Sequence, residues 1–83
     1  MKSTTYNGWA NYETWNVALY IQNESGLYDL ACSLRNRSNP YAEFRYLMID
    51  EFETTRTPDG VSYNDPVLDV TELNSLFQEL ENE

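Results

Sequence analysis

Residues 11–20 read N-Y-E-T-W-N-V-A-L-Y, and this stretch decides the fold that we expect for the chain. Asn11 is a good N-cap, because its side chain accepts hydrogen bonds from the first unpaired amides of a helix. From residue 12 onward, apolar side chains recur at helical spacing in two stripes. Tyr12, Trp15 and Leu19 form one stripe, which the polar Gln22 continues, and Val17, Tyr20 and Ile21 form the other. A helix with two apolar sides usually lies at the centre of its domain.

Helical periodicity continues along most of the 83 residues. Leu27, Leu30, Ala31 and Leu34 follow the spacing of an amphipathic helix, and further stripes begin after Pro40 and near Val70. The pattern predicts helices over 12–24, 27–37, 41–54 and 71–81. We therefore expect one all-α domain over 1–83, a small bundle of about four helices, with frayed ends at 1–8 and 82–83.

Glycine and proline mark the connections between these helices. Gly26 follows the first helix and favours a left-handed C-terminal stop. Pro58, Asp59 and Gly60 form a strong turn signal inside a long loop that we expect over 55–69.

The aromatic residues of the opening stretch have two interpretations, a binding surface or a core. A nucleic-acid stacking site also needs basic residues, and residues 11–20 contain none. We therefore expect Trp15 and Leu19 to anchor the core, Tyr12 to cover its edge, and Trp9 to fold back onto the helix. Leu27 is expected to begin the buried stripe of the second helix.

Charge is distributed unevenly along the chain. The net charge is −9, and residues 50–83 hold ten acids and one base, whereas residues 1–49 hold four of each. This asymmetry opposes direct nucleic-acid binding and favours either a partner protein with a basic surface or simple solubility. The predicted acidic partner-binding surface consists of Asp50, Glu51, Glu53, Asp59, Asp65, Asp69, Glu72 and Glu79.

The residue types that most often act in catalysis or bind metals are scarce. There is no histidine, and the single cysteine, Cys32, has no histidine to activate it, so we expect a buried structural thiol. Asp59, Asn64, Asp65 and Asp69 share the long loop, but their spacing does not match a calcium-binding loop. A solvated acidic loop is the favoured interpretation, and we expect no enzymatic activity, no cofactor and no metal.

Targeting signals are not evident either. The first nine residues, MKSTTYNGW, have no apolar run of signal-peptide type, and no segment approaches the ~20 apolar residues of a membrane span. A lone cysteine allows no internal disulfide and fits a reducing compartment. We expect a cytoplasmic protein that does not bind membranes, with an oligomeric state that the sequence does not indicate.

The segments G-W-A-N-Y-E-T-W-N-V-A-L-Y (8–20) and N-E-S-G-L-Y (23–28) resemble a family of small uncharacterised proteins. That family is encoded largely by bacterial viruses, including viruses of cyanobacteria, and by other mobile elements. The matching positions are Asn11, Glu13, Thr14, Trp15, Val17, Leu19, Asn23, Gly26, Leu27 and Tyr28. They cover about the first third of the chain, and a tryptophan common near the family's closing helix is replaced here by Val70 and Leu73. The resemblance implies a viral origin and an all-helical fold, and transfers no catalytic residue.

Four functions follow as hypotheses. The first is a non-enzymatic protein that binds and modulates a host protein through its acidic surface and exposed Tyr6, Tyr46 or Tyr63. The second is a DNA mimic that inhibits a host DNA-binding or restriction enzyme. The third is a minimal enzyme or metal-binding protein, and the fourth is a virion component or other self-associating protein. The acidic C-terminal third, without a catalytic set of residues, favours the first.

Overall fold

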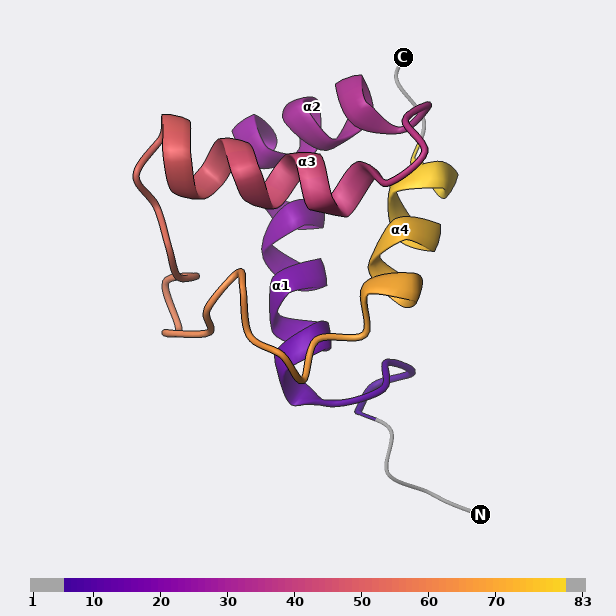
Figure 1. The fold of residues 1–83 in the computed structure, drawn as a ribbon. Coiled ribbons are helices and arrows are strands. Elements are labelled where there is room, and N and C mark those ends of the chain that lie inside the picture. Colours follow the sequence, from indigo (N-terminus) through magenta and orange to yellow (C-terminus); the bar gives the residue numbers. More distant parts are fainter. Residues whose placement is uncertain (1–5, 81–83) are drawn as a thin grey trace.

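The computed structural model describes residues 6–80, which form four α-helices and one π-helical segment, without a named strand (Figure 1). The elements are α1 (Tyr12–Asn23), α2 (Ser25–Leu34), α3 (Pro40–Tyr46), the π-helix η1 (Leu47–Glu51) and α4 (Val70–Glu79). In the view of Figure 1, α1 and α4 stand upright, and α2 and α3 lie across their upper ends. The predicted all-α fold is confirmed.

The junction between α1 and α2 is tighter than predicted. As predicted, Asn11 caps α1, because its side-chain oxygen accepts a 2.8 Å hydrogen bond from the amide of Thr14. A single residue, Glu24, separates the two helices. It has an extended conformation (φ −96°, ψ 117°) and is both the C-cap of α1 and the N-cap of α2. Gly26 therefore lies inside the first turn of α2, and the prediction that it stops α1 is wrong.

The third helix begins at Pro40, whose missing amide suits a first helical position. It continues without a break from α3 into η1 and ends earlier than the predicted residue 54. Glu53 has a positive φ of 56°, which turns the chain away from the helix axis. The Thr54 amide then donates to the carbonyl of Met48 at 2.7 Å and closes this C-terminal turn.

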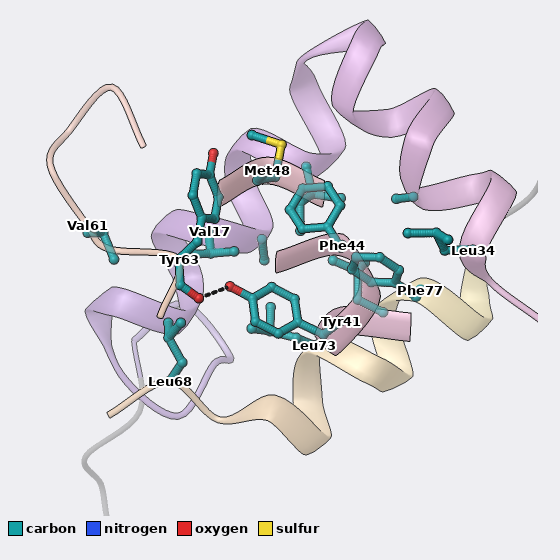
Figure 2. Close-up of a cluster of buried hydrophobic side chains, with 14 residues drawn as sticks. Val17, Leu34, Tyr41, Phe44, Met48, Val61, Tyr63, Leu68, Leu73 and Phe77 are labelled. Atoms are coloured by element: carbon teal, nitrogen blue, oxygen red, sulfur yellow. Dashed lines mark hydrogen bonds between the residues drawn. The ribbon is translucent and has the colours of Figure 1, made fainter. Parts of the chain in front are cut away.

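The core is built around Phe44, which is fully buried (Figure 2). The ring centroid of Phe44 lies 5.4 Å from that of Phe77 and 5.9 Å from those of Tyr41 and Tyr63. Such spacings and tilts are the favourable arrangements of aromatic pairs. Other apolar side chains from α1, α2, η1, α4 and the long loop surround the rings: Val17, Ala18, Ile21, Ala31, Leu34, Met48, Val61, Leu68, Leu73 and Leu76.

The prediction that Trp15 and Leu19 anchor this core is wrong. Helix α1 buries its other side, which carries Val17, Ala18 and Ile21, and both predicted anchors are only partly buried. The two sides of α1 are similarly apolar, so the sequence pattern alone does not show which one meets the other helices. Leu27 does pack against the core, as predicted, although it remains partly exposed.

Residues 52–69 contain no helix and include a small closed loop. The Thr57 amide donates to the Val61 carbonyl at 2.8 Å, and Gly60 turns the chain with a φ of 95°. This loop delivers Tyr63 to the core, where 1% of its surface is exposed. The prediction of an exposed, partner-binding Tyr63 is therefore wrong, because its ring packs on Phe44.

The start of the described chain is also ordered by hydrogen bonds. Tyr6 and Trp9 exchange two backbone hydrogen bonds of 2.7 and 2.8 Å across a tight turn. Asn7 and Gly8 occupy the turn with φ values of 49° and 90°, as an Asn-Gly hairpin turn requires. Fraying was predicted over 1–8 and 82–83; residues 6–8 form this turn instead, while residues 1–5 and 82–83 lie outside the described residues.

Candidate functional site

The carboxylates of the predicted acidic surface fall into separate places. Asp50, Glu51 and Glu53 are exposed at the end of η1, at the upper left of Figure 1. Glu72 and Glu79 lie on α4, at the right of the same view. The fold therefore does not gather the eight predicted residues into one continuous face.

Four of the eight carboxylates accept hydrogen bonds inside the fold. The acceptor and donor pairs are Asp59 with the Asn16 side chain (2.8 Å), Asp65 with the Val67 amide (3.0 Å), Asp69 with the Glu72 amide (3.0 Å), and Glu72 with the Ala10 amide (2.8 Å). Asp69 is the N-cap of α4. The loop carboxylates thus stabilise turns and helix ends, while Asp59 and Asn64 remain exposed to solvent, as the prediction of a solvated loop requires.

The polar residues of the opening motif hold the long loop against α1. Asn16 is fully buried, and its side chain bonds two loop residues at once. Its nitrogen donates to Asp59 Oδ2 at 2.8 Å, and its oxygen accepts from the Thr57 hydroxyl at 2.6 Å. The Thr57 hydroxyl in turn accepts from the Val61 amide at 3.1 Å. A satisfied buried network of this kind fixes one arrangement of the loop.

A second set of bonds from the same motif fixes the end of the loop. The Asn11 side chain donates to the Val67 carbonyl at 2.7 Å, while its oxygen also accepts from the Thr14 hydroxyl at 2.6 Å. The Thr14 hydroxyl accepts from the Asp69 amide at 2.9 Å. Asn11, Thr14 and Asn16 therefore have structural roles, and sequence reasoning found only the cap.

Three tyrosines have raised pKa values. Desolvation, followed by the hydrogen bond and charge of Asp59, raises the pKa of Tyr20. Burial raises the pKa of Tyr63 to about 12 and also raises the pKa of Tyr41. The Tyr41 hydroxyl donates to the Tyr63 carbonyl at 2.6 Å (Figure 2). Both core phenols are therefore neutral near pH 7, and that of Tyr41 acts as a buried hydrogen-bond donor.

An aromatic cluster covers the outer side of α1, formed by Tyr6, Tyr12 and Trp15. The Tyr6 ring lies 5.5 Å from Tyr12 and 4.9 Å from Trp15, and those two rings are 5.6 Å apart. Tyr6 and Tyr12 are each 40% exposed. Exposed Tyr and Trp rings are typical of protein interfaces. The opening motif thus has both a core face and an exposed aromatic face.

A groove lies between the 6–9 turn and α4. We call it the α4 groove; its volume is about 380 Å³, and it is lined by Gly8, Trp9, Gln22, Thr71, Glu72, Ser75, Leu76 and Glu79. The lining contains an indole ring, two hydroxyls and two carboxylates, and no basic residue. Of the predicted acidic residues, it brings together Glu72 and Glu79. Sequence reasoning did not find this groove, because Trp9 and α4 are about sixty residues apart.

Two further features, a metal-ligand cluster and a membrane-spanning helix, are not found in residues 6–80. In this range no three cysteine or carboxylate side chains gather in a metal-binding arrangement. Nor does any helix within it have the length and apolar character needed to cross a bilayer. Cys32 is buried, and the prediction of its burial is confirmed.

The fold and its surface define a class, a small all-α domain that presents carboxylates and aromatic rings around an aromatic core. The chain belongs to DUF7249, a family of unknown function whose model matches residues 2–83. The match extends over the closing helix, well beyond the segment that carries the sequence motif. No curated protein and no solved structure matches the chain.

Proposed function

We propose that this protein is a non-enzymatic, phage-type interaction module that binds a host protein with a basic surface in the host cytoplasm and modulates it. The observation that carries the proposal is the set of carboxylates without an intramolecular cation. Among residues 6–80 the one ion pair joins Arg37 and Glu43, at 3.6 Å. Exposed Asp50, Glu51, Glu53 and Glu79 take no part in it, so their charge is directed at solvent or a partner.

The exposed rings support the same function. Tyr46 is 57% exposed on α3, and the aromatic cluster lies on the outer side of α1. Aromatic side chains supply most of the binding energy in many interfaces, whereas charges accelerate association and select the partner. A basic protein with an apolar contact area matches both features.

A DNA mimic is the sharper alternative, and it requires closely spaced carboxylates along one strip, about one charge per 1.7 Å of duplex axis. The acidic residues at the end of η1 and those on α4 lie at opposite sides of Figure 1. This separation leaves no continuous strip of carboxylates that joins the two groups, and it therefore weighs against the DNA mimic.

The test is affinity capture from lysate of the native host, followed by purification of each captured protein and calorimetric titration. We expect one basic protein to bind directly, with an affinity that falls as salt rises. A variant carrying Asp50→Asn, Glu51→Gln, Glu53→Gln and Glu79→Gln should lose most of this binding while keeping its helical circular dichroism. Capture of only neutral or acidic proteins, or equal binding by the variant, would refute the proposal.

A further inference from the structure

The α4 groove has the geometry and charge of a binding site for a basic peptide. On α4 the lining residues Glu72, Ser75, Leu76 and Glu79 follow the spacing i, i+3, i+4 and i+7, so they share one face. A helix rises 1.5 Å per residue, so the two carboxylates mark positions about 10 Å apart along the groove. Between them lie the hydroxyl of Ser75 and the apolar side chain of Leu76, and the aliphatic stem of a lysine or arginine can pack against the latter.

Trp9 adds an aromatic wall to the acidic strip. Its side chain packs partly against the core and also lines the groove. A cation above an indole ring is attracted by the ring's negative face, and tryptophan is the strongest of the aromatic residues in this respect. An indole next to carboxylates is therefore suited to a guanidinium or ammonium group.

The wall is held in place before any ligand arrives. Trp9 lies in the closed 6–9 turn, and the next residue, Ala10, donates its amide to Glu72 Oε1 at 2.8 Å. This bond attaches the residue that follows the turn to α4. A site that is already ordered loses less conformational entropy on binding.

The charge of the groove selects the occupant. Its lining carries two carboxylates and no base. The guanidinium of Arg35 donates a 3.0 Å hydrogen bond to the carbonyl of Leu80, the residue after Glu79. The volume of about 380 Å³ lies within the usual range of ~300–1,000 Å³ for ligand pockets.

We propose that the α4 groove is the principal docking site for a basic segment of the partner protein, with an arginine or lysine side chain against Trp9 and between Glu72 and Glu79. The inference rests on the proposed function and deepens it. It assigns recognition to one concave site, whereas the proposed function requires only an acidic surface.

The experiment uses the full chain and a short fluorescein-labelled peptide with two arginines, followed by anisotropy. The control peptide replaces both arginines with citrulline, which keeps the shape and removes the charge. We expect the arginine peptide to bind and the citrulline peptide to bind at least about tenfold more weakly, because charge-assisted hydrogen bonds are lost. Equal binding of the two peptides would overturn the inference.

Matched variants separate the groove from the general acidic surface. Glu79→Gln removes a groove carboxylate, and Glu51→Gln makes the same change at an exposed site at the end of η1. We expect about a three- to fivefold loss of affinity for the first and less than about twofold for the second. Ser75→Lys should abolish binding by placing a cation in the groove, while Gln78→Lys, an equal charge change on an exposed α4 position outside the lining, should not.

The outcomes distinguish this inference from the proposed function. Equal losses of affinity within each variant pair would assign binding to the whole acidic surface. The α4 groove would then not be the docking site, and the proposed function would stand. Spermidine binding as tightly as the peptide would make the occupant a small polyamine. Concentration-dependent dimers that Ser75→Lys dissociates would make it a second copy of the chain. Either result would overturn the inference, whereas capture of a basic host protein tests the proposed function separately.

Discussion

Asn16 and Thr57 are 41 positions apart in the sequence, and in the folded protein the Thr57 hydroxyl donates a buried 2.6 Å hydrogen bond to the Asn16 side-chain oxygen. The same asparagine donates to Asp59, so a single side chain of α1 fixes both sides of the turn that precedes Gly60. This contact joins the opening motif to the long loop, which has no helix of its own.

Replacing Asn16 should therefore destabilise the protein strongly. Asn16→Ala removes the acceptor of the Thr57 hydroxyl and one donor to the Asp59 carboxylate, and we expect a loss of about 2 kcal/mol in the free energy of unfolding. Urea denaturation measures this loss. Asn23→Ala, at the exposed end of the same helix, is the control and should change stability by less than about 0.5 kcal/mol. Equal effects of the two substitutions would contradict the structural role of Asn16.

The Tyr41 hydroxyl should contribute to stability through its 2.6 Å bond to the Tyr63 carbonyl. Tyr41→Phe removes the donor and leaves a buried carbonyl unpaired, so we expect a loss of about 1–2 kcal/mol. Tyr46→Phe makes the same chemical change at a side chain that is 57% exposed, and it should have almost no effect. Thermal denaturation of both variants provides the comparison.

The stability of the fold should decrease in strongly alkaline solution, because Tyr63 is buried as a neutral phenol. A tyrosine with a raised pKa holds its proton more tightly when folded, so the unfolded chain releases the proton first. The ordinary pKa is 10.0, and burial raises that of Tyr63 to about 12. This contribution is intact below pH 10 and is lost as pH rises through 12. Melting temperatures from pH 9 to 12 should decline, and Tyr63→Phe should decline less steeply than Tyr46→Phe.

Glu53 occupies a backbone conformation that favours glycine, with a φ of 56°. Glu53→Gly should stabilise the protein by about 0.5–1 kcal/mol, because a side chain in the left-handed region is strained by about that amount or more. Glu51→Gly, two residues earlier within η1, should instead destabilise by about 1 kcal/mol, because glycine is a poor helix former. The opposite signs can be measured by chemical denaturation, and a loss of stability in both variants would contradict the assignment.

The helices themselves were predictable because their signals are local. The Asn11 cap, the proline that begins α3 and the apolar spacing of α2 and α4 depend only on residues within a few positions of one another. The end of η1 was missed because a positive φ at a glutamate has no clear sequence signal. The candidate groove was missed because its walls come from the 6–9 turn and from α4.

By itself, the sequence of this protein determined an all-α fold, the positions of the helices and the concentration of negative charge in residues 50–83, because periodicity, capping and charge are properties of neighbouring residues. Only the tertiary structure decided which apolar side of α1 is buried, leaving Trp15 with the surface aromatic cluster. It also decided that Asp59 and Asp69 stabilise the fold, while Glu79 borders a groove. The physical reason is that burial and hydrogen-bond pairing depend on contacts between segments far apart in the chain, and those contacts form only when the helices pack.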